Sequence, residues 1–131
     1  MIVVDASALV AIGDEESDWD VYFEVLAANE AVTTSINYVE TGIILIRRGR
    51  MERKPDFDVW LTRLGVRVHG ADDLATPALA AYLAFGRGYH PARLNLADCF
   101  AYALAKQLEA PLLFKGADFA LTDVKRALQP T

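Results

Sequence analysis

The sequence predicts a three-layer α/β/α sandwich with a short, mainly parallel central sheet. Short apolar runs alternate along the chain with longer amphipathic patterns of helical period, which is the order that βα units produce. The first run, Ile2–Val4, is β-branched at every position, as expected of a strand that helices cover on both faces. The chain of 131 residues has the length of one domain, and we expect a single domain spanning 1–131.

The first half of the chain is expected to form two strands and several helices. Strand 2–4 leads into a helical turn at 8–12, and a helix at 18–29 follows with Ser17 as its N-cap. Strand 31–34 precedes a helix at 35–48 capped by Ser35, and the next helix begins at Pro55 or Asp56 and ends at Leu64. The helix at 18–29 is expected to bury Trp19, Tyr22, Phe23 and Leu26, and the helix at 35–48 is expected to bury Ile36, Val39, Ile43 and Ile46.

The second half repeats this alternation. Strand 66–69 precedes a helix at 72–85. Because proline is tolerated only in the first turn of a helix, Pro77 indicates that this helix could instead begin near Thr76. The glycine-rich segment 86–91 predicts a loop, a strong helix follows at 94–109, and strand 112–114 comes next. A short segment begins at Thr122, and the tail after Leu128 is expected to fray. The loop lies just ahead of an acid-bearing helix, so Arg87 and His90 could meet a substrate, although solvent exposure alone also explains them.

Four acids stand at positions where carboxylates need an explanation. Asp5 directly follows the first strand, at the end of the sheet where open α/β folds bind ligands. Asp5 or Ser7 could instead simply cap the following helix. Asp118 lies just past strand 112–114, and Glu40 and Asp98 interrupt the apolar stripes of two helices. A carboxylate on a buried face is costly unless a partner compensates it.

A divalent cation is the partner that this pattern predicts. No arginine or lysine falls on the stripes beside Glu40 or Asp98, and only Lys115 lies near a strand end. Two carboxylates 4 Å apart repel by about 4 kcal/mol at an effective dielectric near 20. An all-oxygen site selects Mg²⁺ or Mn²⁺ over zinc, and such a site suits phosphodiester hydrolysis. We therefore expect metal-binding, catalytic acids, with Asn95 hydrogen-bonded to one of them: Asp5, Glu40, Asp98 and Asp118.

Composition limits the other possibilities. The net charge of −5 argues against a protein that coats nucleic acid electrostatically. One basic cluster is best explained as a solvated helix end, with phosphate contact left open: Arg47, Arg48, Arg50, Arg53 and Lys54. The single cysteine, Cys99, allows no internal disulfide and is expected in the core, and His69 is expected to be structural. No leader peptide or membrane span is apparent, so we expect a cytoplasmic protein.

Several motifs in fixed order resemble those of the PIN-domain ribonucleases, and most of all the VapC-type toxins of toxin–antitoxin pairs. They are MIVVDASALV (1–10), NYVE (37–40), LNLADCFAYALA (94–105), LFKGADF (113–119) and TDV (122–124). The resemblance implies a metal-dependent endoribonuclease that cuts RNA and is inhibited by a VapB-like antitoxin. It also implies a homodimer, which can join a larger complex with the antitoxin.

The resemblance assigns roles residue by residue. Asp5, Glu40 and Asp98 match the three core acids of the family, and Asp118 matches a fourth, more variable acid. Hydroxyl positions that support the acids by hydrogen bonding are matched by Ser7 and Thr122. The chain has Ala97 where the family often has glycine, which could alter how closely a neighbouring backbone approaches.

Three other interpretations stay open on the sequence alone. A PIN-like fold could act only as a protein-binding module without activity. A signalling receiver domain also has an acidic pocket and a lysine, but it takes an acid pair after its first strand, where Asp5 has no acidic neighbour. A phosphatase with an aspartate nucleophile would require a second acid at the position of Ser7.

Overall fold

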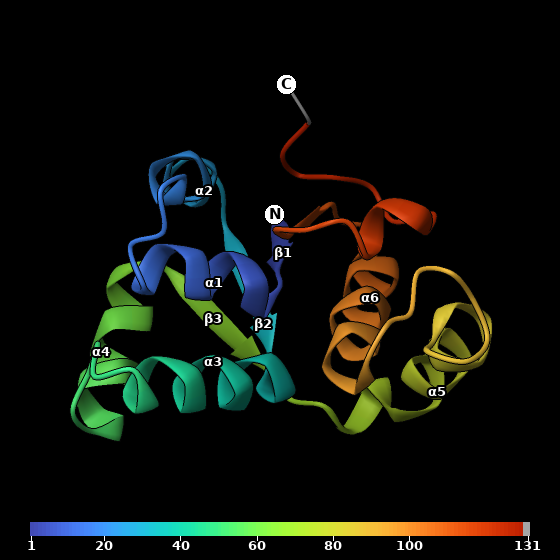
Figure 1. The fold of residues 1–131 in the computed structure, drawn as a ribbon, viewed down its shortest axis with the longest axis horizontal. Helices are drawn as coiled ribbons and strands as arrows, with labels where there is room; N and C mark the ends of the chain where they lie inside the picture. Colours follow the sequence, from blue (N-terminus) through green and yellow to red (C-terminus); the bar gives the residue numbers. More distant parts are fainter. Residues whose placement is uncertain (130–131) are drawn as a thin grey trace.

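A computed structural model describes residues 1–129 and shows the predicted three layers (Figure 1). The central sheet has four parallel strands in the order β3-β2-β1-β4. These strands are β1 (Ile2–Val4), β2 (Ala31–Thr34), β3 (Val66–His69) and β4 (Leu112–Leu113). In register, Ile2 pairs with Ala31 and Val3 pairs with Leu112, so β1 lies in the middle of the sheet.

Six α-helices cover the two faces of this sheet (Figure 1). One side carries α1 (Ala6–Gly13), α2 (Trp19–Ala27), α3 (Ser35–Arg47) and α4 (Lys54–Arg63). The other side carries α5 (Ala75–Phe85) and α6 (Leu96–Leu108). Two short 3₁₀ helices, η1 (Asp72–Leu74) and η2 (Phe119–Leu121), complete the described elements.

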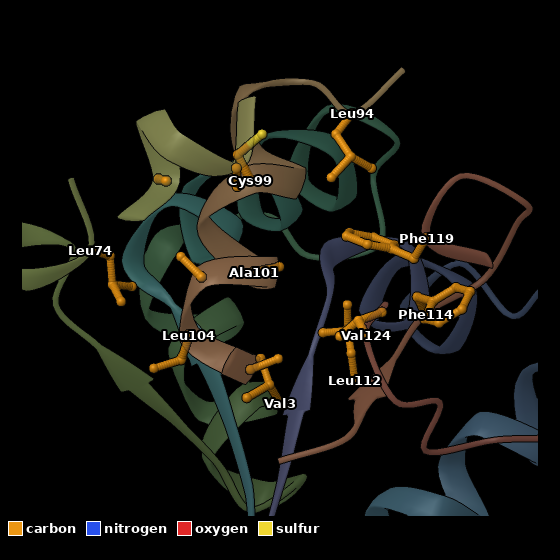
Figure 2. Packing of buried hydrophobic residues seen from close by; sticks show 14 of the residues in the cluster. Val3, Leu74, Leu94, Cys99, Ala101, Leu104, Leu112, Phe114, Phe119 and Val124 are labelled. Carbon is orange, nitrogen blue, oxygen red and sulfur yellow. The ribbon is translucent and has the colours of Figure 1, made fainter. Parts of the chain in front are cut away.

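The side chains of β1 alternate between two hydrophobic cores, because successive strand residues point to opposite faces. Ile2 and Val4 belong to the core under α1, α2 and α4. Val3 belongs to the second core, which Figure 2 shows with α6 and the segment after β4 packed over it. That second core includes Leu104, Leu112, Phe114, Phe119 and Val124. The sequence prediction of a strand buried on both faces is thus confirmed.

Helix α3 buries a different face from the one predicted. Its buried residues are Asn37, Thr41, Gly42 and Leu45, whereas Val39 and Ile43 are each 52% exposed. Thr34, not Ser35, is the N-cap, and its side-chain oxygen accepts a hydrogen bond from the backbone N–H of Asn37. Gly42 permits close packing against α4, since a Cβ there would lie 3.1 Å from the ring of Phe57. The apolar stripe of α3 therefore faces outward.

Other elements differ from the prediction in smaller ways. In α2, Tyr22 and Leu26 are buried, but Trp19 and Phe23 are 39% and 41% exposed, and Asp18 rather than Ser17 precedes the helix. The segment 72–85 divides into η1 and α5, which places Pro77 in the first turn of α5, where proline is tolerated.

The C-terminal third also differs in detail. Helix α6 begins at Leu96, and β4 ends at Leu113 rather than at 114. Arg126 forms an isolated bridge with Leu112, so the chain after η2 returns to the edge of the sheet. Residues 130 and 131, part of the tail expected to fray, lie outside the described residues.

Most residues of the basic cluster, together with His69 and Cys99, have structural surroundings that account for them. Arg48 and Arg50 bind Asp14 at the end of α1, and Arg53 and Lys54 pair with two acids of α4. His69 Nε2 lies 3.0 Å from Asp73, and Cys99 is buried as predicted. Within residues 1–129, the helices are all too short or too polar to cross a membrane.

Candidate active site

Four acidic side chains come from the ends of elements that meet at the carboxyl edge of the sheet. Asp5 joins β1 to α1, and Asp118 lies between β4 and η2. Glu40 comes from the second turn of α3, and Asp98 comes from the first turn of α6. The negative charge of Asp5 raises the pKa of both Glu40 and Asp98, and the charge of Asp118 raises the pKa of both aspartates. The four acids therefore form one electrostatic group.

Asp5 is the buried centre of this group, with only 3% of its surface exposed. It is also the N-cap of α1, so the capping interpretation is confirmed, and a cap in this position can still belong to the acidic group. Its Oδ2 accepts hydrogen bonds from the Ser7 hydroxyl at 2.6 Å and from the Ser7 backbone N–H at 3.0 Å. The Ser7 hydroxyl in turn accepts from the backbone N–H of Lys115 at 3.0 Å. Ser7 thus connects Asp5 to the loop that carries Asp118.

Asn37 contacts the buried acid Asp5, although the sequence pattern predicted no role for it. It is completely buried, and its side-chain amide donates to Asp5 Oδ1 at 3.2 Å. The Thr34 hydroxyl donates to Asn37 Oδ1 at 2.5 Å, which fixes the orientation of the amide. The signal in the sequence was the Thr34-x-x-Asn37 spacing at the start of a helix, which places the two side chains one turn apart.

Asp98 has a different local role from the predicted one. It is the third residue of α6 rather than a residue in the middle of a buried stripe, and it forms a capping box with Asn95. The Asn95 backbone N–H donates to Asp98 Oδ2 at 2.9 Å, and Asn95 Oδ1 accepts from the Asp98 backbone N–H at 2.8 Å. The expected pairing of Asn95 with Asp98 is present, and it holds the carboxylate at the start of the helix.

Burial and mutual repulsion make three of these carboxyl groups weaker acids than carboxyl groups in water. Desolvation is the largest cause for each, and it raises the pKa of Asp5, Glu40 and Asp98. For Asp98, the neighbouring charges of Asp5, Asp118 and Glu40 add to desolvation and bring the pKa to about 7. A cation that bound near these carboxylates would favour their ionised forms and lower their pKa values.

No lysine or arginine within residues 1–129 forms an ion pair with any of the four acids. Lys115 lies nearest along the chain, but its ammonium binds Glu16 at 2.5 Å and Asp18 at 2.9 Å. Oxygen donors of this kind suit a hard divalent cation. Over the same residues, no three acidic, histidine or cysteine side chains are close enough together to hold one ion directly. The chemistry of the donors, which are all carboxylate oxygens, is the chemistry that Mg²⁺ prefers.

The sequence matches the PIN domain family over residues 2–125. The chain belongs to the PIN-domain family. Ribonuclease VapC of Mycolicibacterium smegmatis is 44% identical over 126 residues, which cover 94% of this chain and 97% of that protein. Ribonucleases VapC42 and VapC30 of Mycobacterium tuberculosis are 44% and 38% identical, and the matches cover 96% and 98% of this chain and 98% and 100% of those proteins. This PIN domain is thus of the VapC type, as the motifs predicted.

A solved structure of M. tuberculosis VapC20, described as a Sarcin-Ricin loop cleaving toxin, has the same fold as this PIN domain. Its TM-score is 0.77, it is 20% identical, and the match covers 99% of this chain and all of the other. At that identity the likeness supports the fold alone. The family membership replaces the receiver-domain and phosphatase interpretations.

The end of the PIN domain departs from one expectation. Thr122 was expected to support an acid, but its hydroxyl donates to the backbone carbonyl of Phe119 at 2.8 Å and accepts from the Val124 N–H at 3.3 Å. Its side chain therefore stabilises the turn after η2, because local backbone groups offer a serine or threonine hydroxyl its nearest partners. Asp118 precedes this turn and is exposed.

An apolar groove of about 460 Å³ runs beside Glu40, between α3 and the start of α6. It is lined by Val39, Ile43, Asn95, Leu96 and Ala97, among others. Ala97, where the family often has glycine, thus lines this groove. The outward stripe of α3 explains why the groove is apolar.

Proposed function

We propose that this chain is a Mg²⁺- or Mn²⁺-dependent endoribonuclease that hydrolyses phosphodiester bonds in RNA. The observation that carries the proposal is the electrostatic group of four carboxylates without a lysine or arginine partner among the described residues. Membership of the VapC ribonucleases supports the choice of RNA as substrate.

Asp5, Glu40, Asp98 and Asp118 would hold the cation, directly or through water. A bound divalent cation would neutralise the phosphate and lower the pKa of the attacking water. The chain itself contributes fixed positions, since Ser7 and Asn37 orient Asp5 and Asn95 orients Asp98. Such orientation by hydrogen-bonded neighbours keeps the carboxylates in place before substrate arrives.

We also propose that a VapB-like antitoxin inhibits this ribonuclease and that the chain forms a homodimer in the cytoplasm. The groove beside Glu40 and a second groove between α5 and α6 share Leu96, so together they form one apolar strip. Its exposed members are Val39, Ile43, Leu79 and Leu96. Such a continuous exposed strip is a surface that a second copy could cover, and antitoxin binding could join dimers into a larger complex.

RNA cleavage by purified protein tests the proposed function. We expect cleavage with Mg²⁺ or Mn²⁺, none with EDTA, and strongly reduced cleavage from the Asp98→Asn variant. Sequencing the RNA ends would then identify the cleavage site. If folded wild-type protein leaves RNA intact with both metals, the alternative of a PIN-like protein-binding module without activity is the correct one.

A further inference from the structure

The loop of residues 86–94 joins α5 to α6 and leads into the helix whose first turn carries Asp98 (gold in Figure 1). The Arg87 N–H donates to the Leu94 carbonyl at 3.1 Å, and the Leu94 N–H donates to the Phe85 carbonyl at 3.0 Å. These bonds close the base of the loop one residue before Asn95, the N-cap of the helix that carries Asp98. Arg87 and Arg93 therefore flank the entrance to that helix.

Arg93 adopts an unusual backbone conformation, with a φ of 54°. A residue with a side chain rarely adopts positive φ, and doing so costs free energy that the surrounding structure must supply. The Arg93 N–H donates to the His90 carbonyl at 3.0 Å, which helps to hold this conformation. Arg93 therefore holds a costly conformation five residues before Asp98, which points to a function for its position.

The two arginines of this loop are among the basic residues of the described chain that no acid neutralises. Six of the 13 lysines and arginines form ion pairs with acids, and these six are Arg48, Arg50, Arg53, Lys54, Lys106 and Lys115. Arg87 and Arg93 are exposed and form no ion pair within residues 1–129. A protein with a net charge of −5 needs free cations near its site to hold an anionic polymer.

Aromatic rings accompany these two arginines. Tyr89 is 61% exposed, and its ring meets the edge of Tyr82 with the ring centres 5.9 Å apart. His90 packs against Phe85, and its Nδ1 accepts from the Ala92 N–H at 3.0 Å. That bond requires a neutral His90 ring to carry its proton on Nε2. An exposed ring next to free cations is the combination with which proteins bind single-stranded nucleic acid.

We infer that the 86–94 loop binds single-stranded RNA and guides it to the acidic site. Arg87 and Arg93 contact phosphates, and Tyr89 stacks on an unpaired base. Double-stranded RNA offers no unstacked base to Tyr89, so the loop favours single strands. This inference rests on the proposed ribonuclease function and names the part of the chain that holds its substrate.

Binding by the Asp98→Asn protein separates substrate binding from cleavage. The probe is a fluorescein-labelled, unstructured RNA of about 20 nucleotides, longer than the usual site size, measured by fluorescence anisotropy with Mg²⁺. In this background, adding Arg87→Ala and Arg93→Ala should raise the Kd about tenfold or more and reduce the salt slope by about 1.4, the value for two lost phosphate contacts on a single strand.

A matched control removes two other arginines. Arg63 and Arg67 are also exposed and form no ion pair within the described residues, but they lie on α4 and β3. Arg63→Ala with Arg67→Ala changes the net charge equally and should alter the Kd less than about twofold if binding is local. Tyr89→Ala should weaken binding about fivefold, whereas Tyr89→Phe keeps the ring and should restore it.

Three results would overturn the inference. These are an unchanged Kd without Arg87 and Arg93, an equal loss in the control, or no measurable binding by the Asp98→Asn protein at low salt. The proposed function is judged separately by cleavage. If wild-type protein cleaves RNA and the arginine variants behave like their parent, only the loop assignment falls. If wild-type protein never cleaves RNA but binds it through the loop, the ribonuclease proposal falls instead.

Discussion

Two regions of this molecule contain the same type of side chain, aspartate, but in opposite electrostatic surroundings. At the end of α1, Asp14 accepts hydrogen bonds from Arg48 and Arg50, and these arginines lower its pKa. At the carboxyl edge of the sheet, burial and neighbouring carboxylates raise the pKa of Asp5 and Asp98. The first region ties two helices together. The acids of the second region have no lysine or arginine partner among the described residues, which is the pattern expected of a cation site and is the basis of the function proposed above.

The largest effect should follow from removing one carboxylate of the site. Asp98→Asn keeps the capping oxygen but loses a negative charge, and it should lower RNA cleavage by about 10³-fold, because a catalytic metal contributes several kcal/mol. The control is Asp56→Asn, which removes an exposed acid paired with Arg53 at 3.4 Å. Cleavage rates of both variants would compare an acid of the proposed site with a paired surface acid. Equal activities of the two variants would contradict the proposed role of Asp98.

A smaller effect is expected when the buried amide beside Asp5 is lost. Asn37→Asp keeps the shape but replaces the donor to Asp5 with a negative charge, and kcat/KM should fall about 10- to 100-fold. The pKa of Asp5 should rise further, so the acid limb of the pH–activity profile should move to higher pH. A loss of activity without that displacement would show that Asn37 supports the fold and does not position Asp5. Circular dichroism would verify that the variant is folded.

The site should also make the metal-free protein sensitive to alkaline pH. The pKa of Asp98 is raised from 3.8 to about 7, so between these values the folded chain keeps a proton that the unfolded chain has released. The stability of the metal-free protein must therefore fall as the pH rises through this window. In EDTA, Asp98→Asn should gain roughly 3–5 °C in Tm over wild type at pH 8, corresponding to about 1 kcal/mol, and much less at pH 4.5.

Thermal unfolding at the two pH values measures this difference directly. The same comparison with Asp14→Asn should have the opposite sign, because Arg50 and Arg48 lower the pKa of Asp14 and its loss removes favourable pairing. If both variants changed the Tm in the same direction at pH 8, the two regions would not differ as described.

The smallest effect is expected at the boundary between the two regions. Lys115 contributes its backbone N–H to Ser7, while its ammonium pairs with Glu16 and Asp18. Lys115→Met keeps the backbone bond, so unfolding should become easier by less than about 1 kcal/mol, as for other partly exposed ion pairs. Cleavage should fall only a few-fold. A loss as large as that of Asp98→Asn would mean that the lysine ammonium belongs to the site.

The sequence predicted the fold, because strands with apolar residues on both faces and helices of regular period leave a clear pattern. It also pointed to four acids whose charges interact in the structure, and their role as metal ligands stays a prediction. It failed at α3, where the more apolar stripe of Val39 and Ile43 was assigned to the core. The core instead contains Asn37 and Thr41, whose polar groups are satisfied by hydrogen bonds that a hydrophobic pattern cannot reveal. Asp98 was selected for its place on a stripe, although its role as a cap places it at the helix start. Such contacts depend on residues that the fold brings together.

Carboxyl titration by NMR tests the central claim most directly. With Asp and Glu side chains labelled with ¹³C, the metal-free protein should show Asp98 titrating near pH 7. Saturating Mg²⁺, which is diamagnetic, should lower the pKa of Asp98 markedly. It should also lower the pKa values of Asp5 and Glu40, since a bound cation favours the ionised form. Identical titration curves with and without the ion would contradict the claim that these acids form a cation site.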